Sequence, residues 1–131
     1  MAQKYIGSPV RRKEDKRFLT GQGQFVDDVT LPNLHHAAIL RSPHAHAQVL
    51  SIDTSSALEM EGVLDVITYK DIEAAVEPKP IPIRMRTYVG IERFLQYPLA
   101  NDKVRYVGEP VAVVVAKNRY LAEDALDAIV V

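Results

Sequence analysis

Three observations in the sequence predict a single domain of mixed α-helix and β-strand. The chain has 131 residues, of which 47% are hydrophobic and 25% charged, and a chain of that size buries roughly two-thirds of its unfolded surface. Two runs, 63–69 and 111–116, are rich in the β-branched and apolar residues that favour strands. Residues 118–129 place apolar side chains at helical spacing with acidic side chains between them.

The composition excludes several classes of protein and site. Because there is no cysteine, this polypeptide supplies no iron–sulfur ligand, thiolate zinc ligand or thiol nucleophile. The 16 basic and 17 acidic residues leave a net charge of -1, which gives no global field for nucleic acid. The longest apolar run, Val111–Ala116, is far shorter than the roughly 20 residues of a membrane-spanning helix. We therefore expect a cytoplasmic chain with no membrane or nucleic-acid partner.

Residues 1–17 are predicted to form an extended basic arm. Gly7, Ser8 and Pro9 break any helix there, and the arm carries more basic than acidic side chains. After the arm, two aromatic and apolar pairs flank residues 20–23, whose two glycines permit a tight reversal. This pattern predicts a small hairpin or a corner.

The next part of the chain alternates short strands and short helices. We predict strands at 34–41, 47–52 and 63–69, because these runs are apolar or β-branched and are stopped by turn residues. A short helix is expected to begin at a cap on Asp53 or Thr54 and to end at Met60, and a second is expected over 71–76.

Residues 77–98 form a proline- and arginine-rich segment, predicted to be a long loop. Its prolines at every second position hold the chain extended and donate no backbone hydrogen bonds. Arg84, Arg86 and Arg93 present guanidinium groups that are suited to the carboxylates of a partner. A solvent-exposed loop with no partner is an equally good interpretation.

The last third predicts a bent pair of strands followed by a helix. Strands at 104–107 and 111–116 are separated by Gly108, Glu109 and Pro110, and the second, wholly apolar, is the best candidate for a core strand. Asn118 is a suitable cap for the helix after it. Residues 129–131 have the composition of a further strand, so we expect the sequence to be a fragment of a longer chain whose unpaired sheet edge favours self-association.

All four histidines, His35, His36, His44 and His46, lie close together in the sequence. A zinc or copper site requires at least a third ligand, which the sequence does not identify, so packed or surface histidines are favoured over a metal-dependent enzyme built on His44 and His46. No phosphate-binding glycine motif and no Gly-x-Ser-x-Gly elbow is present.

The order of motifs resembles the N-terminal part of the large subunit of molybdenum hydroxylases, the family of xanthine dehydrogenase, aldehyde oxidase and carbon monoxide dehydrogenase. The matching stretches run in the family's order along nearly the whole chain: 7–15, 18–28, 31–35, 41–47, 51–53, 61–63, 104–116 and 122–128. The resemblance implies an α+β fold, the α/β-hammerhead, with a mixed β-sheet, a projecting bent β-unit and flanking helices.

The resemblance also implies what this chain does and does not contribute. It implies a structural domain, silent by itself, with no catalytic, cofactor-binding or metal-binding residue. Molybdopterin is expected on later domains of the large subunit, and the iron–sulfur clusters and FAD on other domains or subunits, which are the expected partners. The residues expected at a domain interface are Arg41, His44, His46, Gly108, Glu109, Arg84, Arg86 and Arg93. The alternative is a self-contained binding module whose arginine-rich loop binds an acidic partner.

Overall fold

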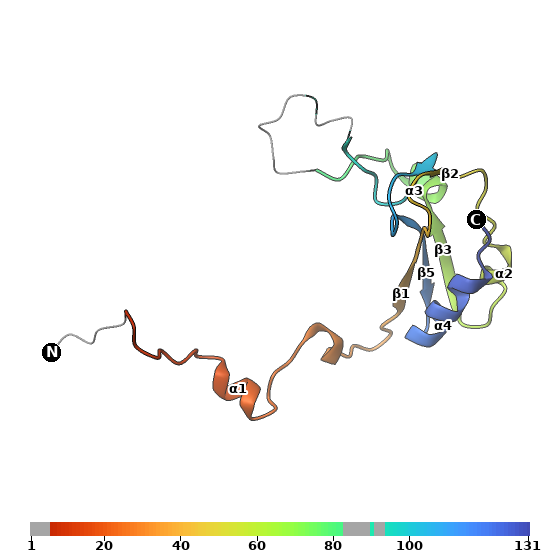
Figure 1. Cartoon of the computed structure of the whole chain (residues 1–131). Coiled ribbons are helices and arrows are strands. Elements are labelled where there is room, and N and C mark those ends of the chain that lie inside the picture. Colours follow the sequence, from red (N-terminus) through yellow and green to blue (C-terminus); the bar gives the residue numbers. More distant parts are fainter. Residues whose placement is uncertain (1–5, 83–89, 91–93) are drawn as a thin grey trace. The chain divides into compact units, whose positions relative to one another are not determined.

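A computed structural model of the chain describes residues 6–82, 90 and 94–131. Arg84, Arg86 and Arg93 of the predicted loop lie outside the described residues. The chain divides into two compact units, Met1–Leu34 and His35–Val131 (Figure 1). Among the described residues, no helix has the length and apolar character needed to cross a membrane.

The described part of the first unit contains two short helices, α1 (Asp15–Leu19) and a 3-10 helix, η1 (Val26–Asp28). The prediction of an extended arm to residue 17 was therefore wrong over its last residues. At the end of α1, the Lys16 carbonyl accepts from both the hydroxyl and the N–H of Thr20, at 2.8 and 3.1 Å. The predicted reversal is a corner without strands, in which the rings of Phe18 and Phe25 stack with centroids 5.8 Å apart.

The second unit is built on a three-stranded sheet in the order β1 (His36–Arg41), β5 (Pro110–Ala116) and β3 (Val63–Thr68). The wholly apolar β5 takes the central place, but the expectation that it is buried on both faces was wrong: Ala112, Val114 and Ala116 are buried, whereas Val113 and Val115 on the other face are only half-buried. It runs antiparallel to both neighbours, so the pairings in this sheet are antiparallel where the expectation was a mixed sheet.

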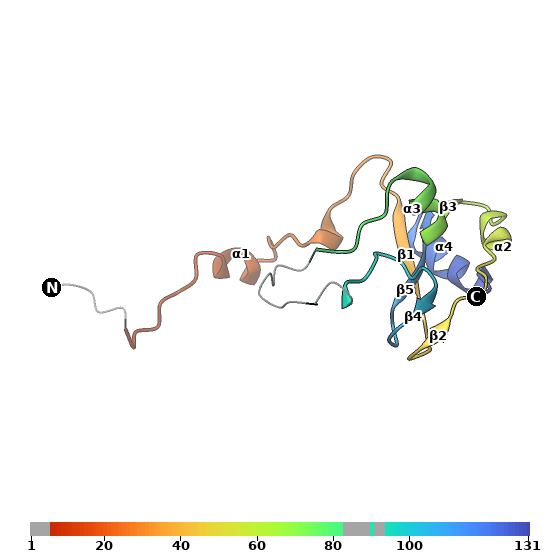
Figure 2. The same ribbon diagram turned by 90° about the horizontal axis from the view of Figure 1, so that it is seen from above.

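The main core lies between one face of this sheet and the helices α2 (Ser55–Leu58), α4 (Arg119–Asp124) and the 3-10 helix η3 (Ala125–Ala128) (Figures 1 and 2). Small residues let the backbones approach closely, because Ala122 and Ala125 face Ala112 and Val114 across the core. The helix predicted from Asn118 is capped as expected, with the Asn118 Oδ1 accepting from the Leu121 N–H at 2.9 Å. It becomes a 3-10 turn from Ala125 onward.

Helix α3 (Tyr69–Ala75) follows β3 directly. Tyr69 was expected to end the strand, but it begins the helix, because the Asp71 carboxylate accepts from both the N–H and the hydroxyl of Thr68, at 2.7 and 2.6 Å. This capping arrangement fixes the start of the helix one residue after Thr68. The same hydrogen bonds hold the pKa of Asp71 below its ordinary value.

A second, two-stranded antiparallel sheet joins β2 (Ala47–Gln48) and β4 (Lys103–Val104). Both strands are shorter than the predicted 47–52 and 104–107. Strand β4 ends because the N–H of Arg105 donates to the carboxylate of Glu109 instead of to a neighbouring strand. The strand predicted at 129–131 is reduced to one antiparallel bridge between Asp53 and Val130.

Candidate interface site

The end of β1 and the turn before β5 are tied together by three hydrogen bonds. The Gly108 N–H donates to the Ser42 carbonyl at 2.8 Å, and the Ser42 N–H donates to the Glu109 carbonyl at 3.0 Å. The Arg41 guanidinium adds a bond from Nη1 to the Gly108 carbonyl at 2.9 Å. Gly108 has φ of 91°, a conformation that favours glycine, so the sharp bend predicted there depends on it.

Glu109 is a buried carboxylate whose two oxygens both face Arg105. One oxygen accepts from the Arg105 backbone N–H, and the other lies 3.6 Å from Nη1 of its guanidinium. The guanidinium is held in turn by the Asp102 carboxylate at 3.1 Å and by the Lys103 carbonyl at 2.9 Å. The Glu109 side chain is only 4% exposed, so this network neutralises a charge that burial would otherwise make costly.

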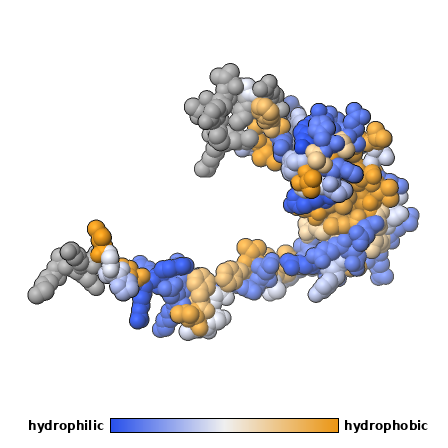
Figure 3. Space-filling model, in the orientation of Figure 1, coloured by the Kyte–Doolittle hydropathy of each residue, from blue (hydrophilic) through white to orange (hydrophobic). Residues whose placement is uncertain are grey.

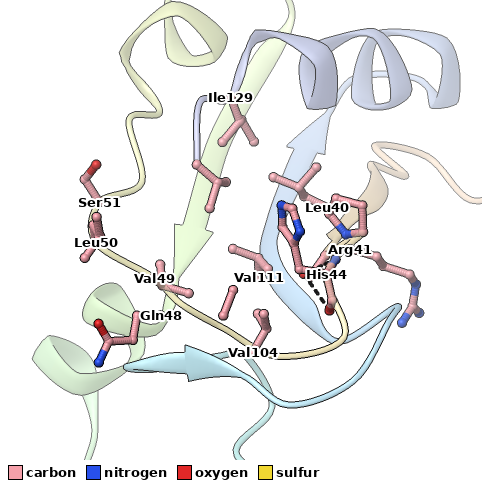
Figure 4. Close-up of a pocket in the computed structure, with 14 residues that line it drawn as sticks. Leu40, Arg41, His44, Gln48, Val49, Leu50, Ser51, Val104, Val111 and Ile129 are labelled. Atoms are coloured by element: carbon pink, nitrogen blue, oxygen red, sulfur yellow. Dashed lines mark hydrogen bonds between the residues drawn. The ribbon is translucent and has the colours of Figure 1, made fainter.

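The two histidines of the 44–46 stretch are both exposed, but in different settings. The His44 N–H donates to the Ser42 hydroxyl at 3.0 Å, and His44 lines a groove beside Leu40 and Arg41 (Figure 4). His46 makes no hydrogen bond or ion pair within the described residues. The structure thus bonds Arg41 to the 108–109 turn and links His44 to that turn through Ser42.

No group of three or more His, Asp or Glu side chains within the described ranges is placed to hold a metal ion. His35 is exposed and His36 half-buried at the start of β1. Neither the described histidines nor the described carboxylates therefore form the ligand set that a zinc or copper site needs.

Sequence reasoning missed a groove of about 500 Å³ that is lined by residues of both sheets. Its walls are mostly apolar, and Figure 4 shows Val111 at its centre, Leu40 on one side and Leu50 on the other. Arg41, His44 and Val131 are also among the residues that line it. The only sequence signal was the short apolar run after Ala47, which predicted a longer strand than the structure forms.

Asp53 lies two residues after Ser51, which lines the groove. Its carboxylate accepts from the hydroxyl and the N–H of Ser55, at 2.6 and 3.0 Å, and these bonds hold the pKa of Asp53 below its ordinary value. The carboxylate therefore stays ionised at neutral pH and fixes the start of α2, while the Asp53 backbone pairs with Val130.

A family model for the aldehyde oxidase and xanthine dehydrogenase a/b hammerhead domain matches residues 20–131. The chain belongs to this family. The α+β hammerhead fold that the motifs implied is thereby confirmed for the larger part of the chain.

Curated relatives align with nearly all of this hammerhead domain, but the alignment covers only a small part of each relative's own length. The nicotine 6-hydroxylase large subunit of Paenarthrobacter nicotinovorans is 48% identical over 93% of this chain and 15% of its own length. The carbon monoxide dehydrogenase large chain of Afipia carboxidovorans is 40% identical over 96% of this chain and 15% of its own. The hammerhead chain therefore spans about 15% of the length of these relatives.

Solved structures agree with this assignment. CO dehydrogenase from Oligotropha carboxidovorans superposes with a TM-score of 0.77 at 38% identity, over 95% of this chain and 14% of that one. Quinoline 2-oxidoreductase from Pseudomonas putida 86 gives a TM-score of 0.79 at 39% identity, over 98% of this chain and 16% of that one. These comparisons do not support the alternative of a self-contained binding module.

Proposed function

We propose that this hammerhead domain is a structural part of the large subunit of a molybdopterin-dependent oxidoreductase of the aldehyde, xanthine or carbon monoxide dehydrogenase type. In this proposal residues 1–131 form one domain of a longer chain and have no activity alone. The names of the relatives support it, since they include a hydroxylase large subunit, dehydrogenase large chains and a nicotinate dehydrogenase large molybdopterin subunit.

The contacts of the Glu109 carboxylate are the observation that best supports a structural role for this domain. A carboxylate with one oxygen on a backbone N–H and the other beside a guanidinium is committed to holding its own turn. Arg41, whose guanidinium is bonded to the Gly108 carbonyl, serves the same turn. This polar network therefore shapes the turn, and in this proposal the reacting groups belong elsewhere in the complete enzyme.

Molybdopterin is proposed to lie in other domains of the large subunit, with iron–sulfur clusters and FAD on further domains or partner subunits. A chain without cysteine supplies no thiolate for an iron–sulfur cluster, so such clusters require another polypeptide stretch. Relatives are named as members of assemblies, among them the 6-hydroxypseudooxynicotine dehydrogenase complex subunit gamma.

The interface with those parts is proposed to include the exposed side chains around the 108–109 turn. Arg41 and His44 are exposed residues that line the groove, and His46 is exposed two residues further along the chain. Arg84, Arg86 and Arg93 complete the proposed set and lie outside the described residues. An interface built on exposed guanidinium and imidazole groups fits carboxylates on the neighbouring surface.

The test uses the complete large subunit, expressed with its partner subunits. The double variant Arg41→Ala, His44→Ala is expected to lower the yield of assembled, molybdenum-containing enzyme several-fold while leaving kcat per molybdenum unchanged. His35→Ala, which removes another exposed histidine, is the matched control and is expected to change neither. A double variant that assembles normally contradicts the interface, and one that assembles but loses kcat per molybdenum contradicts the structural role.

A further inference from the structure

The stretch after β2 has the composition of a strand but lacks a partner. Within the described residues, the backbone groups of Leu50, Ser51 and Ile52 make no hydrogen bond, although Val49 before them and Asp53 after them both do. Leu50 is 90% exposed, which is unusual for a leucine beside an apolar surface. Unpaired backbone next to exposed apolar side chains is the character of an open strand edge.

The β-bridge at Asp53 sets the direction and the register of any strand that pairs with this edge. The Asp53 N–H donates to the Val130 carbonyl at 2.8 Å, and the Val130 N–H donates back to the Asp53 carbonyl at 3.0 Å. This is one complete antiparallel pair. Continued in the same register, Val131 stands opposite Ile52, and the residue that follows Val131 stands opposite Ser51.

The groove lies along this same line. Val131 is one of the residues that line it, and Leu50 and Ser51 lie together on one side (Figure 4). Figure 4 shows Val111 between that wall and Leu40 on the other side, so the floor is apolar. A backbone that runs down the groove from Val131 would meet hydrogen-bonding groups on one side and apolar side chains beneath it, which is the environment of an added strand.

We propose that this groove receives an additional β-strand, formed by the stretch of the large subunit that follows Val131 and paired antiparallel with the 50–53 segment. The proposal rests on the proposed function, because it assigns the occupant to the same large subunit. A segment joined covalently to Val131 has a large advantage in effective concentration over a second copy of the chain. The backbone of the added strand would pair with the 50–52 stretch, beside the exposed side chain of Leu50.

The register gives a direct test, since the chain has no cysteine of its own. The probe is the 131-residue chain extended by a tail of about five residues, alternating threonine and valine, an ordinary strand length. The test variant combines Ser51→Cys with a cysteine as the first added residue. The control keeps Ser51→Cys and moves the tail cysteine to the second added residue, whose side chain points to the opposite face.

Mild oxidation is expected to form an intramolecular disulfide several-fold faster in the test variant than in the control, as judged by non-reducing electrophoresis and mass spectrometry. The tail without cysteines is expected to raise the Tm by about 5 °C. Equal rates in the two registers, or an unchanged Tm, would overturn the proposal. Disulfide-linked dimers in place of the intramolecular bond would also overturn it and would assign the groove to a second copy.

If the tailed variants do not fold, hydrogen exchange on the complete large subunit provides a second test of the added strand. The amide of Ser51, whose N–H faces the added strand in the register of the Asp53–Val130 pair, is expected to exchange at least about tenfold more slowly in the complete subunit than in the 131-residue chain. The N–H groups of Leu50 and Ile52 point away from that strand and serve as the internal control. Equal exchange in the two proteins contradicts the added strand. None of these measurements depends on molybdenum, so a failure here is distinguishable from a failure of the proposed function.

Discussion

The stretch from residue 6 to residue 34 and the unit from 35 to 131 both contain many apolar side chains, yet only the second has a core. No residue from 6 to 34 is buried, although Leu19 and Val26 are as apolar as the core residues. In the second unit, the pairing of β3 with β5 brings Val66 and Val114 together, and Ile129, which follows η3, joins the same core. Figure 3 shows hydrophobic surface on both stretches. The difference shows that long-range strand pairing, rather than apolar content, makes the core.

The largest expected effect compares two valines. Val114 is fully buried at the centre of β5, whereas Val26 is 88% exposed. Val114→Asp buries an unpaired carboxylate at a cost of about 3–5 kcal/mol, a large share of a small domain's stability. We expect thermal unfolding followed by circular dichroism to lose its cooperative transition. Val26→Asp is expected to leave the Tm within about 1 °C, and an equal loss in both variants would break the contrast between the two regions.

The next effect compares two glycines that both have positive φ. Gly62 has φ of +94°, and an added Cβ would lie 2.6 Å from Cδ1 of Leu121 in helix α4. Gly62→Ala is expected to lower the free energy of unfolding by about 2 kcal/mol in urea titration, from backbone strain and displacement of Leu121. Gly21 has φ of +70° with no atom within 4 Å of the added Cβ. Gly21→Ala is also strained by its φ, but that strain falls in the 6–34 stretch, where no residue is buried, so the urea midpoint of the domain should be unchanged. A shift as large as that of Gly62→Ala would show that the two glycines are equivalent.

Two ion pairs provide a smaller comparison. Glu109→Gln keeps the shape of the side chain but removes a buried charge that faces Arg105 at 3.6 Å. The expected loss is about 1–2 kcal/mol in the free energy of unfolding. Asp15→Asn removes the exposed partner of Arg12, at 3.5 Å, and is expected to cost almost nothing. Urea titrations of both variants at neutral pH measure the difference, and a result in the reverse order would contradict the structural role of Glu109.

The smallest effect is a pH dependence at the start of α3. The pKa of Asp71 is lowered in the folded chain by hydrogen bonds from the hydroxyl and the N–H of Thr68. A lowered pKa gives stability that is present above the unfolded value of about 3.9 and is lost as the pH falls through the folded value. Asp71→Asn should therefore lower the Tm by a few degrees at pH 7 and by progressively less below about pH 4. A Tm difference that does not change with pH would contradict this assignment.

Local sequence signals predicted most of the second unit. The unbroken apolar run at 111–116 identified the central strand, and Asn118 identified the start of α4. Gly108 and Glu109 were correctly expected to shape a bend before β5. These features depend on residues close to one another in the chain, and their physical causes are visible in the sequence.

The missed features depend on partners that are distant in the sequence or on competing hydrogen bonds. Arg41 bonds to the carbonyl of Gly108, which lies 67 residues away. The strand predicted after Ala47 stops early because the 50–52 stretch has no partner among the described residues, and the one predicted after Lys103 stops because the Glu109 carboxylate takes the Arg105 N–H. The groove is formed by both of these shortened strands together with Val131.

The most direct test of the account is the cofactor content of two purified proteins. One is the complete large subunit, expressed with the partner subunits that co-purify with it, and the other is the 131-residue chain. We predict molybdenum, iron and flavin in the complete assembly and no stoichiometric molybdenum, measured by elemental analysis, in the short chain. Stoichiometric molybdenum bound to the 131-residue chain alone would contradict the claim that this hammerhead domain is a structural part of a larger enzyme.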